Sequence, residues 1–469
     1  MISTKVLVVG AGIAGLSAAC LLQEAGITDV VILEASDRIG GRIHTVMLGD
    51  DGMPIEMGAN WIHGCSLDNS VFAIADQIGA ITPYRLINRA SSRFMREDGS
   101  EIERETVLKA YYMYKTVERE MHDMMRQLKA ESGKQQFIPL NHYRRLLEKE
   151  RDLQKTDNNI EDIIRVHNAL LNYVRFHEGN ELEEVAWEGG SMWAIPEGGD
   201  VHLPYGYHQV LQYLVRKLPV NLVKLNSAVV KIAYGGNVRN KKVHVNTTNG
   251  EQYETDHVVI TCSIGYLKKH CNSLFEPPLH MEKVRTINSM GMGRVNKIFL
   301  QFESPVTSPS FKNIVFAWND TDVKQDKSAW FKRIFGFDQV FTKDNTILGW
   351  VAGEGAEYME DLSDEEIGNT CVKILKQFMG RADLPRLKAI RVSRWCSNPY
   401  TLGSYSHQTA RLTPGEQEDL ARPVRCPLSK KPLLMFAGEA LVNACTQGAR
   451  DSGLRAASSI IQHYTTSKL

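Results

Sequence analysis

The first apolar run of the chain, Lys5-Val6-Leu7-Val8-Val9, shows no alternation with polar residues. A run of this kind is typical of a parallel strand that is buried on both faces. Residues 16–24 are rich in alanine and leucine and predict a helix, and the apolar residues 30–33 predict a second strand. Strand, helix and strand in this order indicate the beginning of a parallel α/β sheet.

A different pattern occupies residues 103–179, which are charged, poor in glycine and helical in period. Their apolar positions recur at separations of three and four residues, so one face of a helix should pack inward. That face consists of Tyr114, Val117, Met121, Met124 and Leu128. We interpret this stretch as a helical insert.

Residues 293–302 alternate between apolar and polar side chains and predict another strand. The alternation places Lys297 on the same face as Val295 and Phe299. A lysine in this position lies at a sheet edge with its ammonium in water, or is buried for a chemical purpose, and the pattern alone favours the edge. Further apolar strands are expected at 230–232, 258–267 and 433–439.

The glycines that follow the first strand carry a specific signal. Gly10-Ala11-Gly12-Ile13-Ala14-Gly15 lies between the predicted strand and helix, which is the context of a dinucleotide-binding fingerprint. In that fingerprint the first glycine permits the turn, the second lets the backbone approach a pyrophosphate, and the third lets the helix pack on the strand. The helix N-terminus then offers free N–H groups to the phosphates. An ordinary glycine loop is the alternative, and the matching strand and helix argue against it.

Glu34 ends the second strand, 19 residues beyond Gly15. An acid at this spacing accepts hydrogen bonds from an adenosine ribose, and its charge disfavours NADP. NAD and FAD both use the fingerprint. The following segment, Arg38-Ile39-Gly40-Gly41-Arg42, adds two glycines and two guanidinium groups beside the diphosphate, which favours a permanently held dinucleotide.

At this point the segment from Gly10 through Arg42 resembles the start of the flavin-containing amine oxidase family, whose paired glycines and arginine run along the FAD. Residues 56–64, Glu-Met-Gly-Ala-Asn-Trp-Ile-His-Gly, are similar to the segment that passes the flavin ring in polyamine oxidases. Residues 348–353 and 394–405 also match family segments. The resemblance implies non-covalent FAD binding by Gly10, Ala11, Gly12, Ala14, Gly15, Glu34, Ala35, Gly41, Arg42, Gly58, Ala59, Asn60, Trp61, Val229, Glu439, Thr446, Gly448 and Ala449.

The resemblance also implies catalytic and substrate-binding residues. Lys297 matches the lysine that holds a water against the flavin N5, and His63 is the second catalytic candidate. Trp61, His63 and Tyr405 are expected to line the space in front of the flavin. Glu181 or Glu183 is expected to attract a distal ammonium group. Without the family context, a histidine beside a tryptophan is usually a packed residue, and Tyr405 could belong to the core.

The composition of the chain indicates which classes of partner and site are unfavourable. Lys plus Arg and Asp plus Glu are 55 each, so no overall field attracts nucleic acid or a membrane surface. The eight cysteines show neither a CxxC pair nor a paired spacing, which favours reduced thiols over a metal site or a disulfide framework. No run reaches the ~20 apolar residues of a spanning helix. Ser467-Lys468-Leu469 matches the tripeptide that the peroxisomal import receptor reads, so a peroxisome is expected, with the cytoplasm as the alternative.

We therefore expect an α/β fold of the amine oxidase type. A Rossmann-like FAD-binding domain would comprise residues 1–85, 200–288 and 407–469, and an interleaved α+β substrate-binding domain would comprise 86–199 and 289–406. The expected activity is FAD-dependent oxidation of polyamines by oxygen, acting on spermine, spermidine or their N1-acetyl forms and yielding hydrogen peroxide. Alternatives are an oxidase of monoamines or other amines, an NAD-dependent dehydrogenase, and a catalytically silent FAD-binding scaffold. The scaffold gains some weight because residues 440–445 are short and lack the aromatic residues usual in animal polyamine oxidases.

Overall fold

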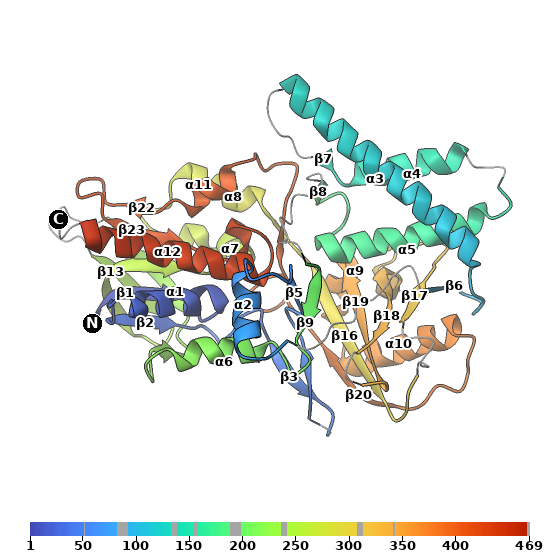
Figure 1. Cartoon of the computed structure of the whole chain (residues 1–469), viewed down its shortest axis with the longest axis horizontal. Coiled ribbons are helices and arrows are strands. Elements are labelled where there is room, and N and C mark those ends of the chain that lie inside the picture. Colours follow the sequence, from blue (N-terminus) through green and yellow to red (C-terminus); the bar gives the residue numbers. More distant parts are fainter. Residues whose placement is uncertain are drawn as a thin grey trace.

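The protein forms two lobes, each built around its own sheet (Figure 1). The computed structural model describes residues 1–50, 52–81, 92–132, 138–153, 157–187, 198–235, 242–306, 313–340 and 343–466. No helix in these ranges combines the length and apolar character that crossing a bilayer requires. All eight cysteines are free thiols. The described residues contain no cluster of histidine, cysteine and acidic side chains suited to a metal ion.

The first lobe contains a nine-stranded sheet with the strand order β10-β2-β1-β13-β12-β11-β14, to which β23 and β22 are added beside β13. The strands are β1 (Ile2–Val9), β2 (Val30–Leu33), β10 (Val223–Lys224), β11 (Val229–Ala233), β12 (Val243–Thr247), β13 (Gln252–Ile260), β14 (Phe275–Glu276), β22 (Val424–Arg425) and β23 (Pro432–Phe436). β1, β2, β13 and β23 run parallel, with Val9 beside both Leu33 and Ile260 and with Ile260 beside Phe436. The segments that follow these four strands therefore meet at one edge.

Helices cover both faces of this sheet because side chains along a strand alternate in direction. Val6 and Val8 share a core with α1 (Ile13–Glu24), α2 (Ser70–Gln77), α6 (His208–Arg216) and α12 (Thr446–Thr466). Leu7 and Val9 share the opposite core with α7 (Ile264–Leu274) and α8 (Met281–Ser289). The apolar run that predicted a strand buried on both faces is thus explained.

The second lobe contains a six-stranded sheet in the order β20-β16-β19-β18-β17-β6. Its strands are β6 (Arg93–Met95), β16 (Val295–Phe302), β17 (Asn313–Phe316), β18 (Ile334–Gln339), β19 (Thr346–Ala352) and β20 (Leu387–Val392). One face packs on α9 (Gly353–Met359) and α10 (Asp364–Phe378). Part of the other face packs on α3 (Arg104–Ser132) and α5 (Ile160–Glu178), and α4 (Asn141–Leu153) lies beyond them.

Two small antiparallel ribbons extend from the first lobe. The hairpin of β3 (Thr45–Leu48) and β4 (Met53–Glu56) shares a hydrophobic cluster with Phe299 and Leu348 of the six-stranded sheet. β5 (Trp61–His63) pairs with β9 (Asp200–His202), so residues far apart in the sequence become neighbours.

The structure confirms the predicted fold class and the helical insert, whose stripe on α3 includes the fully buried Val117 and Met121. The strands of each sheet fall within the residue ranges assigned to the two domains, although the exact boundaries remain a prediction. The strand expected at 258–267 is wrong in its second half. β13 ends at Ile260, and α7 begins after Ser263, whose hydroxyl accepts a hydrogen bond from the Tyr266 N–H at 3.0 Å and so caps a helix.

Candidate functional site

One large cavity, of about 980 Å³, lies where the lobes meet. Its walls include the segments after β1, β2, β13 and β23 in the first lobe, and β16, β18, β19 and the end of α5 in the second. Its position follows from the sheet topology, since ligands of parallel α/β sheets bind beyond the carboxyl ends of the strands.

The glycine turn after β1 forms the end of the cavity that lies in the first lobe. Gly10 has φ +104°, and a Cβ there would lie 2.4 Å from Thr261 Oγ1. A Cβ on Gly15 would lie 2.0 Å from the Gly10 carbonyl oxygen, so Gly15 lets α1 begin close against the turn. The N-cap of α1 is Gly12, which has no side chain to occupy the free N–H groups. These donors are left for a ligand.

Glu34 faces the same end of the cavity from β2. Its carboxylate accepts hydrogen bonds from the Ala11 N–H at 2.7 Å and from the Ser36 N–H at 2.9 Å. These bonds fix the carboxylate in place. Because an ionised carboxylate has about four acceptor sites, it can still accept hydrogen bonds from a ligand.

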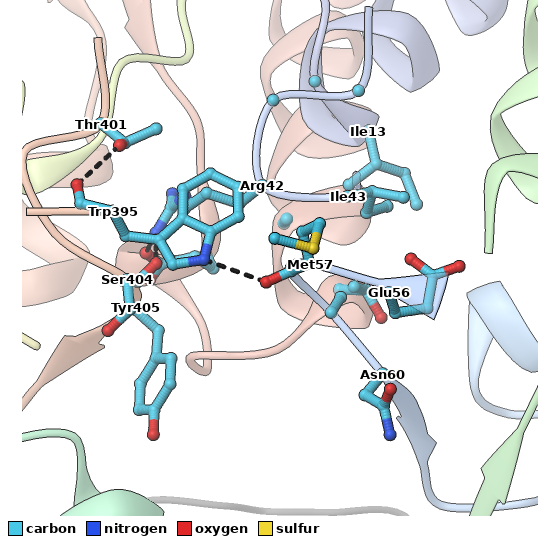
Figure 2. A pocket seen from close by; sticks show the side chains of 18 of the residues that line it. Ile13, Arg42, Ile43, Glu56, Met57, Asn60, Trp395, Thr401, Ser404 and Tyr405 are labelled. Atoms are coloured by element: carbon cyan, nitrogen blue, oxygen red, sulfur yellow. Dashed lines mark hydrogen bonds and ion pairs between the residues drawn. The ribbon is translucent and has the colours of Figure 1, made fainter. Parts of the chain in front are cut away.

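Arg42 and Glu439 join the glycine-rich segment to the loop after β23. The Arg42 guanidinium bonds Glu439 Oε1 and donates to the Ser404 carbonyl at 3.1 Å. Figure 2 shows Arg42, Trp395 and Met57 together on the cavity wall, with the Trp395 Nε1 bonded to the Met57 carbonyl. Position 58, which lies in the wall beside Arg42, requires glycine, because a Cβ there would lie 1.8 Å from the Arg42 carbonyl oxygen.

Lys297 is the most distinctive side chain of the site. It is 2% exposed, and β16 lies between β20 and β19, which excludes the sheet-edge position that the pattern alone favoured. Its Nζ donates to the Glu56 carbonyl at 2.7 Å and the Gly58 carbonyl at 2.6 Å, and lies 3.3 Å from Asn60 Oδ1. It also lies 4.6 Å from the ring centroid of Trp350, its partner across the strands.

Burial lowers the pKa of Lys297 to about 7, although the Glu56 carboxylate raises it in part. Burial likewise raises the pKa of Glu56, and its Oε2 has no hydrogen-bond partner among the described residues. Three acceptor oxygens surround the Lys297 Nζ, and only the ammonium form offers three N–H donors. The pKa of Lys297, lowered by burial, lies close to neutrality, where a group can both give and take a proton.

His63 and Trp61 line the cavity from β5. The His63 Nδ1 is hydrogen-bonded to Asp200 Oδ1 at 2.9 Å, because the β5–β9 pairing places these residues opposite each other. Asp200 was not a sequence candidate. Only the pairing of two strands 137 residues apart reveals it.

Aromatic side chains of the second lobe form another wall that the sequence reading missed. Tyr173, Phe176 and His177 come from the last two turns of α5, and Phe176 stacks on Trp350 with centroids 5.4 Å apart. The Tyr405 hydroxyl donates to the Phe176 carbonyl. Residues 440–445 were expected to provide no aromatic wall, and α5 and β19 supply one instead. The spacing of 173, 176 and 177 on one helix face was the available signal.

Residues 440–445 contribute Ala444 and Cys445 to the cavity instead. Burial raises the pKa of the Cys445 thiol to about 11, so this side chain is neutral at physiological pH.

The assignment of Glu181 or Glu183 to a distal ammonium needs correction. Glu181 is 2% exposed, and its oxygens accept hydrogen bonds from Arg175 at 2.9 Å and from Arg333 at 3.0 Å. Glu183 forms an ion pair with Lys324 at 3.1 Å. Neither lines the large cavity. Glu181 is a buried structural anchor because two guanidinium groups already neutralise it.

The other sequence candidates separate into two groups. Ala11, Gly15 and Gly448 pack behind the wall and do not line the cavity. The structure brings together along the cavity Gly10, Gly12, Ala14, Glu34, Ala35, Gly41, Arg42, Gly58, Ala59, Asn60, Trp61, His63, Val229, Lys297, Tyr405, Glu439, Thr446 and Ala449. Whether each binds cofactor or substrate stays a prediction.

The cavity fits an extended dinucleotide. An uncapped helix N-terminus and Arg42 suit a diphosphate, Glu34 suits a ribose, and the glycines leave room for a ligand against the backbone. The Ser404 hydroxyl, which lines the same cavity, is buried without a partner among the described residues. An unpaired buried hydroxyl of this kind is expected where a ligand completes the site.

Comparison with known proteins gives a consistent result. The family model described as flavin containing amine oxidoreductase matches residues 13–461. The peroxisomal N(1)-acetyl-spermine/spermidine oxidases of Bos taurus and Homo sapiens are each 30% identical to this chain over 97% of its length and 94% of theirs. A solved structure of a putrescine oxidase variant superposes with a TM-score of 0.69 at 20% identity, covering 98% of this chain and 99% of that one.

The depressed pKa of Lys297 predicts a pH-dependent effect of Lys297→Met on stability. Between about pH 7 and pH 10 the unfolded chain keeps a proton on Lys297 that the folded protein has lost, so wild-type stability rises with pH across this window. The variant lacks this term. Its stability relative to wild type should therefore be greatest at about pH 7 and fall toward pH 10, by up to about 3 kcal/mol.

Urea unfolding of the FAD-free proteins at both pH values measures this difference. Lys373→Met, at an exposed position of α10, is the matched control and should show no such trend. A constant difference between Lys297→Met and wild type across the pH range would contradict the assignment.

Proposed function

The chain belongs to the flavin-containing amine oxidoreductase family, and we propose that it is a polyamine oxidase that uses FAD and molecular oxygen. The two mammalian relatives, by their names, oxidise N1-acetylated spermine and spermidine. The observation that carries the proposal is the buried Lys297, whose Nζ faces the cavity wall formed by Glu56, Gly58 and Asn60.

The residues of the first lobe would hold the FAD non-covalently. We assign the diphosphate to the N-terminus of α1 and Arg42, the ribose to Glu34, and the adenine to the wall at Val229. The flavin ring would lie along residues 58–61 and the start of α12, near Thr446. When bound, the flavin supplies a two-electron acceptor for the carbon next to the substrate nitrogen, and oxygen then yields hydrogen peroxide.

The residues of the second lobe would prepare the amine. Phe176, Trp350 and Tyr405 exclude water from the space beside Lys297, and removal of water lowers the pKa of an amine. The reactive nitrogen is thereby favoured in its neutral form. Lys297, which titrates near neutral pH, can hold or transfer a proton next to it.

Two carboxylates would attract the remaining positive charges of a polyamine. Five acidic residues line the cavity: Glu34, Glu56, Asp200, Asp338 and Glu439. Glu34 is bonded to backbone N–H groups, Glu439 to Arg42, and Glu56 is buried with its pKa raised. Asp200, beside His63, and Asp338, at the end of β18, line the same cavity, and in this proposal they take the place of Glu181 and Glu183, which do not.

The other functions proposed from the sequence receive less support. A monoamine oxidase needs no carboxylate for a distal cation, whereas Asp200 and Asp338 line this cavity in addition to the three acids assigned above to other contacts. A silent scaffold would not need a lysine buried at the cofactor wall. Burying an amine lowers the free energy of unfolding, and a protein without catalytic activity gains nothing in return.

We also propose a peroxisomal location through Ser467-Lys468-Leu469. These three residues lie outside the described part of the structure. Support comes from the tripeptide itself and from the names of the relatives, which are peroxisomal.

Lys297→Met should lower the rate of flavin reduction by a polyamine about a hundredfold or more, the contribution usual for a proton-transferring group. The variant should retain FAD, because its side chain is not among the groups assigned to the diphosphate or ribose. Anaerobic stopped-flow bleaching with spermine and N1-acetylspermine measures the rate, and the flavin spectrum measures retention. The exposed Lys373→Met should react like wild type. A purified protein that binds no FAD, or is not bleached by any amine, would overturn the proposed function.

Asp338→Asn and Asp200→Asn should each raise the KM for spermine about tenfold, the loss expected when a charged hydrogen bond is removed. Benzylamine, which has no second cation, should be affected much less. Steady-state peroxide formation measures both, with Asp361→Asn, an exposed residue outside the cavity, as the control. Equal changes for both amines would show that the carboxylates do not read the distal charge.

Substitution of Leu469 by aspartate should move the protein from peroxisomes to the cytosol, whereas Lys468→Arg, which keeps the charge, should not. Fluorescence microscopy of fusions with the tag at the N-terminus distinguishes the two locations. Peroxisomal fluorescence of the aspartate variant would refute this tripeptide as the address.

A further inference from the structure

A second cavity, of about 290 Å³, lies among four helices of the first lobe: α1, α2, α6 and α12. None of its lining residues lines the large cavity. Ten water molecules occupy a similar volume at about 30 Å³ each, so the space can hold a small organic molecule. Figure 1 shows these helices grouped at one face of the nine-stranded sheet.

The cavity has a polar rim and a buried floor. Glu24, Gln77 and Lys217 are exposed at the rim, and Lys217 Nζ bonds Glu24 Oε1 at 3.2 Å. Ser17 and Leu214 are buried at the floor. The rim charges therefore neutralise each other.

Two polar groups facing this cavity lack partners within the part of the chain that the structure describes. The Ser17 hydroxyl forms no hydrogen bond, and because the residue is only 1% exposed, bulk water does not satisfy it either. Arg450 Nε is also buried and has no hydrogen-bond partner among the described residues, although the Asp451 carboxylate acts on the guanidinium electrostatically. The neighbouring Asp451 accepts a hydrogen bond from Ser70 at 2.5 Å. Unpaired buried donors of this kind are rare and costly unless a ligand satisfies them.

We propose that this cavity is a binding site for a small aliphatic carboxylate. A carboxylate accepts two parallel hydrogen bonds from one edge of a guanidinium, which Arg450 offers, and a further one from the Ser17 hydroxyl. The apolar side chains of Leu21, Ile74 and Leu454, together with Leu214, provide a surface for a short hydrocarbon chain.

The remaining side chains favour a single negative charge over a phosphate dianion. Lys217 is already paired with Glu24, whereas Arg450 forms no salt bridge among the described residues and is influenced by Asp451 and Glu24 only at longer range. Burial raises the pKa of the Cys20 thiol to about 11, so Cys20 adds no charge of its own. A carboxylate matches this single positive charge.

The second cavity is lined by α1 and α12, two helices whose N-terminal residues also line the large cavity. Arg450 directly follows Ala449, which lines the large cavity, and Ser17 lies on the helix that starts at the phosphate-facing Gly12. A ligand that binds only the folded protein stabilises it by RT ln(1 + c/Kd), where c is the concentration of free ligand. Occupation of this site should therefore stabilise the packing of α1 against α12.

The test uses the FAD-loaded full-length enzyme and butanoate as the probe. Ligand-observed NMR titration should show saturable binding with a Kd in the roughly millimolar range, which is reasonable for six heavy atoms. Acetate should bind more weakly because it lacks the hydrocarbon chain, and butan-1-ol should not bind because it lacks the charge. The flavin absorption spectrum should stay unchanged, since the site is separate from the large cavity.

Two variants locate the site. Arg450→Gln should raise the Kd for butanoate about tenfold or more, because it removes the positive charge and one of the two parallel hydrogen bonds, and Ser17→Ala should raise it by a smaller factor. Arg455→Gln is the matched control, because Arg455 is an exposed arginine on the same helix that does not line the cavity. The thermal unfolding temperature should rise with butanoate in wild type and Arg455→Gln but not in Arg450→Gln.

Several results would overturn the proposal: no saturable binding of butanoate, equal binding of butanol, tighter binding of inorganic phosphate than of butanoate, or an unchanged Kd in both Arg450→Gln and Ser17→Ala. Ser17→Ala keeps the test decisive if Arg450→Gln fails to fold. None of these results depends on amine oxidation, so failure here is distinguishable from failure of the proposed function.

Discussion

The bonds from the Lys297 Nζ to the Glu56 and Gly58 carbonyls are the contacts on which the site depends, because they connect the two lobes at the wall of the cavity. Lys297 belongs to the six-stranded sheet, whereas residues 56–58 follow the glycine-rich segment of the first lobe. A buried amine is stable only when its donors are satisfied, so these bonds fix the relative position of the two elements. Trp395, bonded to the Met57 carbonyl between them, completes the attachment.

The two lobes contribute chemically different surfaces to the one cavity that they share. The cavity needs backbone exposed to a cofactor at one end and a dry, aromatic surface at the other. The parallel strands of the first lobe supply the former, because their carboxyl ends place Gly12 and Glu34 side by side. The antiparallel strands and α5 of the second lobe supply the latter through Trp350 and Phe176.

The acidic residues after α5 show how a local charge pattern can mislead. Four carboxylates within residues 178–184 suggested an attraction for a cation in the cavity. The structure uses Glu181 to neutralise Arg175 and Arg333, an arrangement that is stable when buried only because both partners are present. The two cations that pair with this carboxylate are Arg175 on α5 and Arg333 just before β18, and Arg333 is far from Glu181 in the sequence.

The sequence by itself determined the glycine turn, the strand before it, the helix after it and the acid at residue 34, because these are local features whose spacing the backbone geometry imposes. It also indicated Lys297, through the resemblance of its surroundings to a family. Only the tertiary structure decided that Lys297 is buried on a central strand, that Asp200 lies beside His63, and that Glu181 is already paired. Each of these facts depends on contacts between residues distant in sequence, and strand order and ion pairing across such distances leave no periodic trace along the chain.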